Sequence, residues 1–378
     1  MNLLEELGAK AARLGVPFSV HLDITYRCNE RCVHCYLDHD DHGEMNTAEI
    51  KKLLGELAEA GVFMLTLSGG EIMLRKDFFE ILERAHELGF LIKLKTNAIL
   101  IGEHDAERMR ELGVEAVQVS IYSHRPEVHD AITKVPGSLK RSLKAIRFLK
   151  AKGLVVTIAN VLMRETAQDY PGVQALAEEL GVMSQLDPTV TPMMDGDRSI
   201  LALNANLDTV REVFRDQGEM VEEFCGVPGG ASEDTLDSAP CSAGHTACYV
   251  SPYGDVYPCV QFPLPSGNVR RTKFVDIWKH SEQLNEVRSI RLRDLPSCSQ
   301  CVHVGSCTRC PGLAYLEGNM RGPSIQDCEK SFARTGVPSV NLLAKQEAAR
   351  AGGGLSGHAA GLVQIQGQIQ VAGLAPAV

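Results

Sequence analysis

Residues 25–36 read TYRCNERCVHCY and place Cys28, Cys32 and Cys35 in one short segment. Three thiolates at this C-x3-C-x2-C spacing can hold three corners of a cubane iron–sulfur cluster, which normally takes four protein ligands. One iron is then left open, and an open metal site is what catalysis requires. A zinc site is the alternative interpretation, but zinc usually takes four ligands and no fourth cysteine lies nearby in the sequence.

This segment follows the first of six short β-type runs that alternate with helical patterns. The runs are Val20–Thr25, Phe63–Ser68, Phe90–Thr96, Ala116–Ile121, Val155–Val161 and Met183–Val190. Because parallel strands need crossover connections, six strands joined by five crossovers predict a parallel sheet. Six βα units are fewer than the eight of a closed barrel, so we expect an α/β fold built on a partial (β/α)6 TIM-like barrel.

Two of the helical patterns have apolar residues at i, i+3, i+4 and i+7. They are Ile50, Leu53, Leu54 and Leu57, and Phe78, Ile81, Leu82 and Ala85. Thr47 precedes the first pattern and is expected to be its N-cap. A glycine stands just past each of five patterns, as is common at helix C-termini. These glycines are Gly61, Gly89, Gly113, Gly153 and Gly181.

The 378 residues carry a formal net charge of -10, which argues against broad nucleic-acid binding. No apolar run of about 18 residues or more predicts a transmembrane helix, and the N-terminus lacks the order of a signal peptide. Twelve cysteines without a secretion signal indicate metal binding or catalysis in a reducing compartment. We therefore expect a cytoplasmic protein with no membrane or nucleic-acid partner.

Composition divides the chain into five predicted parts. Residues 1–17 form an N-terminal helix, 18–200 the barrel, 201–238 a linker helix and loop, 239–336 a small cysteine-rich domain, and 337–378 an Ala/Gly-rich tail. Gly-rich tails are usually disordered, and we expect that of the last part.

Seven residues with polar side chains or no side chain stand where four of the predicted strands end. They are Ser68, Gly69, Gly70 and Glu71 after the second strand, Asn97 after the third, Ser120 in the fourth and Asn160 in the fifth. Ligands of barrel folds bind at the C-terminal ends of the strands. Each residue alone suits a structural role, but their common position predicts one ligand site at that end of the barrel.

Eight more cysteines lie in the predicted cysteine-rich domain. They are Cys241, Cys248, Cys259, Cys298, Cys301, Cys307, Cys310 and Cys328. Eight thiols suffice for two fully ligated four-iron clusters, and loops rich in Gly and Pro fit a fold that metal holds together. Two structural zinc sites remain the alternative, because CxxC pairs bind zinc well.

The first cysteine segment resembles the radical S-adenosylmethionine (SAM) superfamily. The resemblance implies that Cys28, Cys32 and Cys35 bind a [4Fe–4S] cluster whose open iron chelates the amino and carboxylate groups of SAM. The reduced cluster would then cleave SAM to a 5′-deoxyadenosyl radical. His34 takes the place of a family aromatic residue whose backbone lies near the adenine.

The strand-end residues match this family in part. Ser68–Glu71 resembles its GGE segment, which implies that the Glu71 carboxylate faces the methionine ammonium, and Ser120 resembles a serine that faces the ribose or carboxylate. Ile72 stands where relatives more often have proline. Tyr122 stands where relatives often have aspartate, so a role for an acid is lost there.

The second cysteine group resembles the SPASM extension of radical SAM enzymes that modify peptides. Its first half fits that signature, but Thr308-Arg309 gives two residues where the family usually has three. The resemblance implies two auxiliary clusters, with Cys248 the least certain ligand and Cys225 outside both groups. The implied ligand sets are Cys241, Cys248, Cys259 and Cys310 for the first cluster, and Cys298, Cys301, Cys307 and Cys328 for the second.

The family's auxiliary clusters commonly accept an electron after hydrogen abstraction, which implies oxidative modification of a peptide or protein substrate. An external donor such as flavodoxin or ferredoxin would supply electrons. About twenty residues precede the first predicted strand, too few for a leader-binding domain. We therefore expect either a separate small peptide-recognition protein as a further partner or direct contact with the substrate.

Three other functions remain open: a quinone-cofactor type of peptide crosslinking, a sulfatase-maturing oxidation of Ser or Cys, and a non-catalytic iron–sulfur sensor or electron carrier. Acid–base residues are not identified by the sequence, and Tyr122 and Asp255 are candidates for catalysis. Asp276 is a second acid in the cysteine domain, and His129 and Glu165 lie near the predicted mouth of the barrel, where polar residues usually belong to the surface.

Overall fold

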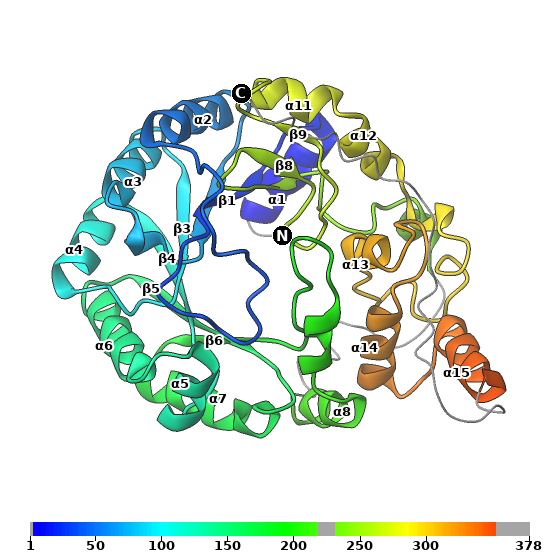
Figure 1. The fold of residues 1–378 in the computed structure, drawn as a ribbon. Coiled ribbons are helices and arrows are strands. Elements are labelled where there is room, and N and C mark those ends of the chain that lie inside the picture. Colours follow the sequence, from blue (N-terminus) through cyan, green and yellow to red (C-terminus); the bar gives the residue numbers. More distant parts are fainter. Residues whose placement is uncertain (1–2, 218–230, 353–378) are drawn as a thin grey trace, which may run out of the picture.

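The structure is a computed structural model that describes residues 3–217 and 231–352. Six parallel strands form an open, partial TIM barrel (Figure 1). They are β1 (Ser19–Thr25), β2 (Met64–Gly69), β3 (Leu91–Thr96), β4 (Val114–Ser120), β5 (Val155–Val161) and β6 (Met183–Asp187). The predicted α/β fold and parallel sheet are therefore confirmed.

The crossover helices form an arc on the outside of this sheet (Figure 1). They are α2 (Thr47–Glu59), α3 (Phe78–Glu87), α4 (Glu103–Glu111), α5 (Pro126–Thr133), α6 (Ser138–Ala151) and α7 (Tyr170–Leu180). The apolar residues predicted for α2 and α3 are all buried in the main core. Burying one such side chain contributes about 1.5–3 kcal/mol, which fixes the two helices against the sheet.

The sheet continues beyond the barrel into the region of the auxiliary cysteines. β7 (Ala247–Val250) pairs in parallel with β1, and β8 (Asp255–Tyr257) and β9 (Gly267–Asn268) extend the edge in antiparallel fashion. All nine strands form one sheet in the order β6-β5-β4-β3-β2-β1-β7-β8-β9. The cysteine-rich region is thus joined to the barrel by backbone hydrogen bonds along β1.

The remaining helices lie before the barrel and after β6. They are α1 (Leu3–Leu14), α8 (Leu207–Asp216), α10 (Glu233–Leu236), α11 (Phe274–His280), α12 (Glu282–Ser289), α13 (Pro311–Leu316), α14 (Ile325–Thr335) and α15 (Val340–Gly352). Figure 1 shows α13, α14 and α15 grouped on the side of the molecule opposite α4. No helix of the described residues is long and apolar enough to cross a bilayer.

Two predicted element ends were wrong for local reasons. Asn46, not Thr47, caps α2: its side chain accepts from the Glu49 amide at 3.0 Å, and Glu49 accepts from the Asn46 amide at 2.8 Å. This reciprocal arrangement satisfies two free amides, whereas a Thr47 cap would satisfy one. β6 ends at Asp187 rather than Val190, because the Asp187 carboxylate accepts from the Thr189 amide and hydroxyl and turns the chain.

The expectation of disorder from residue 337 onward was also wrong for the first part of that tail. Helix α15 begins after Ser339, whose hydroxyl accepts from the Leu342 amide at 3.2 Å. Leu342 is buried, and Lys345 forms an ion pair with Glu329 of α14. Residues 353–378 lie outside the described part of the chain.

Candidate active site

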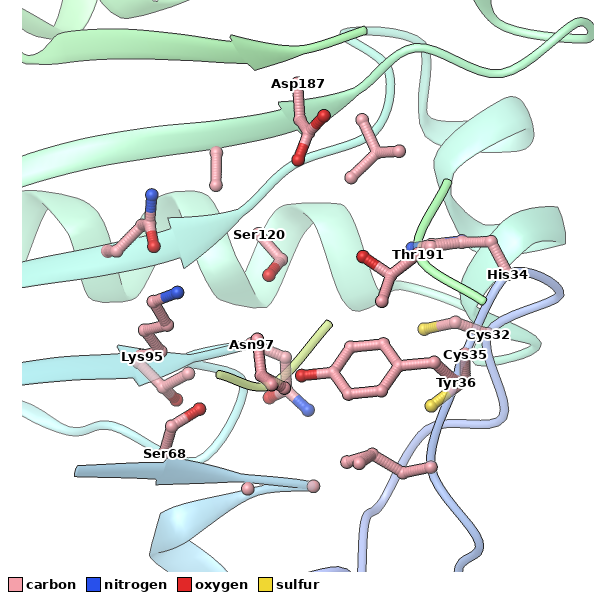
Figure 2. Close-up of a pocket in the computed structure, with 18 of the residues that line it drawn as sticks. Cys32, His34, Cys35, Tyr36, Ser68, Lys95, Asn97, Ser120, Asp187 and Thr191 are labelled. Atoms are coloured by element: carbon pink, nitrogen blue, oxygen red, sulfur yellow. The ribbon is translucent and has the colours of Figure 1, made fainter. Parts of the chain in front are cut away.

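A cavity of about 310 Å³ opens at the C-terminal ends of the barrel strands (Figure 2). Its wall includes the three cysteines of the first loop and residues at or just after the C-terminal ends of β2, β3, β4 and β5. Of the eleven residues predicted to bind cofactor, ten line it: Cys28, Cys32, His34, Cys35, Ser68, Gly69, Gly70, Asn97, Ser120 and Asn160. The eleventh, Glu71, is absent from the lining.

The three thiols of the loop are partly buried and close enough to influence one another. Burial, together with the charges of Glu71, Glu30 and Cys35, raises the pKa of the Cys28 thiol to about 12. The pKa values of Cys32 and Cys35 are raised for the same main reason. Without a metal these thiols stay protonated, whereas bound iron removes the protons and compensates the charge. The donor set therefore fits an iron–sulfur cluster.

Glu30 is a member of this site that the sequence analysis missed. It lies between two of the cysteines, lines the cavity and is 3% exposed. Its Oε2 accepts from the Cys32 thiol at 3.3 Å, while its buried Oε1 has no hydrogen-bond partner among the described residues. Burial raises its pKa to about 7. The available signal was the position of this acidic residue between Cys28 and Cys32, which keeps its carboxylate close to the thiols in the chain.

The two glycines after β2 have a steric role. Gly69 has a φ of 141°, and an added Cβ would lie 2.0 Å from the Thr25 carbonyl oxygen. At Gly70 it would lie 2.4 Å from the carbonyl oxygen of Arg27. The amides of Gly70 and Glu71 donate to those same carbonyl groups at 2.8 and 2.9 Å. The glycines thus let the backbone of the cysteine loop rest directly on the end of β2.

Glu71 does not face the cavity, so the geometry departs from the expectation that its carboxylate meets the ligand ammonium. The side chain is fully buried. It accepts from the Met73 amide at 3.0 Å, from the Thr96 hydroxyl at 2.8 and 2.9 Å and from the Asn97 amide at 2.9 Å. Asn97 in turn donates to Asn29 at 2.7 Å. Glu71 therefore positions the end of β3 against the cysteine loop.

An aromatic group closes one wall of the cavity. The His34 ring meets Tyr122 edge-on with centroids 4.4 Å apart, and Tyr122 stacks on His129 at 5.5 Å. Burial lowers the pKa of both histidines to about 4, so both rings are neutral near pH 7. His129 is 1% exposed, and the interpretation of it as a surface residue was wrong, since its Nδ1 accepts from the Tyr122 amide at 3.2 Å.

The other acid–base candidates lie away from this cavity. Glu165 borders a separate cavity of about 40 Å³ beside Met163. Asp255 lies in β8, where its carboxylate accepts from Asn268 at 2.8 Å, and Asp276 lies in α11. Of the candidates for catalysis named from the sequence, only Tyr122 borders the main cavity.

The part of the cavity away from the cysteines is polar. Lys95 lies on the opposite side of the view from Cys32 and Cys35, and Asp187 lies at the top of the view, at the end of β6 (Figure 2). This part is lined by His21, Lys95, Gln118, Gln185 and Asp187, and the two glutamines are hydrogen-bonded at 2.9 Å. Val260 and Gln261 complete the wall and directly follow Cys259 in sequence, so the auxiliary cysteine region borders the same cavity.

Charge effects divide the auxiliary cysteines into two spatial groups. Burial raises the pKa of Cys328, and so do the charges of Cys307, Cys298 and Cys301. In the other group, Cys241 raises the pKa of Cys259, and Cys259 raises that of Cys310 and of Cys248.

Cys248 is buried in β7 and belongs to the main core. This position fits both a cluster ligand and a buried free thiol. The described cysteines are free of disulfides, and Cys225 lies outside the described residues. Within residues 3–217 and 231–352, no three His, Cys, Asp or Glu side chains are arranged to hold a single metal ion.

Family models match both regions of the chain. The radical SAM superfamily matches residues 22–176, and the SPASM iron–sulfur cluster-binding domain matches residues 241–302. Similar relatives include a PqqA peptide cyclase of Xanthomonas campestris, 30% identical over 88% of this chain and 91% of its own. A mycofactocin maturase of Mycobacterium tuberculosis is 29% identical over 78% of each chain. An AdoMet-dependent heme synthase of Oleidesulfovibrio alaskensis is 28% identical over 83% of this chain and 87% of its own.

Solved structures share the fold. Streptococcus suis SuiB bound to S-adenosylmethionine has a TM-score of 0.68 at 17% identity, over 85% of this chain and 80% of its own. The enzyme anSMEcpe with bound AdoMet has a TM-score of 0.64 at 16% identity, over 88% of this chain and all of its own. The chain belongs to the radical SAM superfamily and carries a SPASM domain, so it is an enzyme that uses SAM, a SAM-binding [4Fe–4S] cluster and auxiliary clusters.

Proposed function

We propose that this enzyme oxidatively modifies a peptide, using a radical generated from SAM. One observation carries the proposal: Val260 and Gln261, which follow Cys259, line the same cavity as Cys28, Cys32 and Cys35. A substrate in this cavity therefore lies between the SAM-binding loop and the auxiliary cysteine region. That placement suits a reaction in which the substrate loses a hydrogen atom on one side and an electron on the other.

In this proposal Cys28, Cys32 and Cys35 hold the catalytic cluster, which supplies the electron that cleaves SAM to a 5′-deoxyadenosyl radical. The nucleotide would lie along Ser68, Gly69, Gly70, Asn97, Ser120 and Asn160, the strand-end part of the lining. His34 and Tyr122 exclude water from one side as uncharged rings. Glu71 acts indirectly, because it holds Asn97 in place.

The auxiliary ligands follow from the two spatial groups. Cys298, Cys301, Cys307 and Cys328 would hold the outer cluster, and we refer to these four residues as the outer cysteine group. Cys241, Cys259 and Cys310 would hold the cluster beside the cavity. Cys248 is the fourth candidate ligand there, because the charge of Cys259 raises the pKa of the Cys248 thiol.

A peptide is the substrate class that the relatives favour, since two of them are named as a peptide cyclase and a mycofactocin maturase. The polar part of the cavity suits a peptide's amide groups and side chains. Heme synthases among the relatives make a tetrapyrrole the second candidate. A sulfatase-maturing reaction is less favoured, because Asp255 and Asp276 do not line the cavity. A flavodoxin or ferredoxin and a small recognition protein are further proposed partners.

The test is product analysis with candidate substrates. Reduced, anaerobically reconstituted enzyme is incubated with SAM and peptides encoded beside its gene, and in parallel with an iron-containing tetrapyrrole precursor. We expect a peptide that has lost hydrogen or carbon dioxide, formed together with 5′-deoxyadenosine and absent with Cys32→Ala. Modification of the tetrapyrrole alone would replace the peptide proposal by the heme-forming one. SAM cleavage with neither product formed would contradict both.

A further inference from the structure

Arg309 is a buried cation in the short segment between two proposed auxiliary ligands, Cys307 and Cys310. Arg309 is 5% exposed. It is one of two residues between Cys307 and Cys310, where the SPASM signature usually has three. Its Nε and Nη2 donate to the Gly322 carbonyl oxygen at 3.1 and 2.6 Å, and Nη2 also reaches the Met320 carbonyl oxygen. Its Nη1 is buried and has no hydrogen-bond partner within the part of the chain that the structure describes.

Among the described residues, no carboxylate forms an ion pair with this guanidinium. A buried charge without a counter-charge is costly, because desolvation is not compensated. Carbonyl dipoles offset part of that cost and leave the positive charge in place. The site therefore calls for an anion that the polypeptide alone does not provide.

The outer cysteine group is a source of negative charge beside Arg309 once it holds a cluster. Arg309 follows Cys307 by two residues, and its charge also acts on the Cys298 thiol. The charges of Asp327 and Lys330 act on Cys307, but these two side chains pair with each other at 2.6 Å. Arg334 is directed to the Thr308 hydroxyl at 3.5 Å. Among residues 3–217 and 231–352, Arg309 is thus the cation without a carboxylate partner whose charge acts on this group.

We propose that Arg309 sets the reduction potential of the cluster held by the outer cysteine group and keeps that potential more positive than the four thiolates alone would give. A four-thiolate cluster is anionic and gains another negative charge on reduction. A desolvated cation beside one ligand therefore stabilises the reduced form more than the oxidised form. The proposal requires an outer cluster but no particular substrate.

The experiment is a redox titration of the reconstituted holoenzyme, followed by EPR, with iron and sulfide counted in each variant. Arg309→Gln removes the charge, and Arg309→Lys keeps it. Arg321→Gln is the matched control, because it removes a cation from the loop of Met320 and Gly322 that Arg309 contacts. The Arg321 guanidinium instead donates to the Ser289 hydroxyl at 3.1 Å. For Arg309→Gln we expect the ratio of reduced to oxidised outer cluster to fall about tenfold at a fixed potential, a shift of about 59 mV for one electron.

Arg309→Lys and Arg321→Gln should stay near the wild-type potential. The same potential in Arg309→Gln as in Arg321→Gln would overturn the proposal, and so would an equal shift in Arg309→Lys. If Arg309→Gln fails to load iron, the potential of the outer cluster in Arg309→Lys decides the test. A wild-type potential in Arg309→Lys supports the proposal, and a shifted potential contradicts it. Loss of the cluster in both variants would assign Arg309 to loop structure and reject the proposal. None of these outcomes depends on peptide modification.

Discussion

The hydroxyl oxygens of Tyr26 and Tyr249 lie 2.5 Å apart in a buried contact that joins the cysteine loop to β7. Tyr249 also donates to Asp23 of β1 at 2.8 Å. Burial raises the pKa of both tyrosines, so both stay protonated at neutral pH. The contact links the start of the SAM-binding loop to the strand that carries Cys248.

Tyr249→Phe should destabilise the protein by about 1–3 kcal/mol, because it leaves buried oxygens of Tyr26 and Asp23 without their partner. The free energy of unfolding in urea, measured on the metal-free protein, checks this. Tyr257→Phe is the control, since Tyr257 packs against the Tyr249 ring with centroids 5.8 Å apart. Equal losses in the two variants would mean that the Tyr249 hydroxyl contributes no more than that of its neighbour, and would contradict a special role for the Tyr26–Tyr249 contact.

Gly70→Ala should prevent assembly of the catalytic cluster and leave the auxiliary clusters in place. The new Cβ would lie 2.4 and 2.5 Å from the carbonyl oxygens of Arg27 and Tyr26, so the cysteine loop must move. Iron content and EPR spectra of reconstituted protein measure the result. Gly55→Ala in α2 is the matched control, because its Cβ meets no atom within 4 Å. A fully loaded Gly70→Ala enzyme would show that the loop tolerates the displacement.

Lys95→Met should lower product formation with the peptide substrate and leave substrate-free SAM cleavage nearly unchanged. Lys95 lines the polar part of the cavity, and Figure 2 shows its side chain on the far side from Cys32 and Cys35. Lys93→Met is the control, because Lys93 lies two residues earlier on β3 and is not part of the lining. Comparing KM and kcat for product with the rate of 5′-deoxyadenosine release separates substrate binding from radical formation.

His129 predicts a pH dependence of stability. Its folded-state pKa is about 4 against an ordinary 6.5, with burial as the main cause and Asp130 opposing it. Between these values the unfolded chain binds a proton that the folded chain does not, so this contribution is present above pH 6.5 and is lost as pH falls toward 4.

Urea unfolding of the metal-free protein at pH 7 and pH 5 should therefore show a smaller loss in His129→Asn than in the wild type. Asparagine retains an acceptor for the Tyr122 amide, which His129 Nδ1 now satisfies at 3.2 Å. Identical pH dependence in the two proteins would show that other groups carry the effect.

Local sequence patterns predicted the barrel well, because alternating burial in strands and apolar spacing in helices are local properties. Glu71 shows the limit of prediction from local patterns. Its motif predicted a ligand-facing carboxylate, but its donors come from Thr96 and Asn97, on another strand. The pairing of β7 with β1 depends on residues more than two hundred positions apart, for which spacing gives no signal. Arg309 looked like one residue of a shortened loop until its burial was known.

The central claim is that Cys28, Cys32 and Cys35 bind an iron–sulfur cluster with one open iron for SAM. The most direct measurement is Mössbauer spectroscopy of anaerobically reconstituted wild-type and Cys32→Ala protein, with SAM added. We predict that SAM changes one iron of one cluster in the wild type, that 5′-deoxyadenosine forms on reduction, and that Cys32→Ala loses both while it retains the auxiliary iron. Zinc at this loop, or a wild-type spectrum that SAM leaves unchanged, would contradict the account.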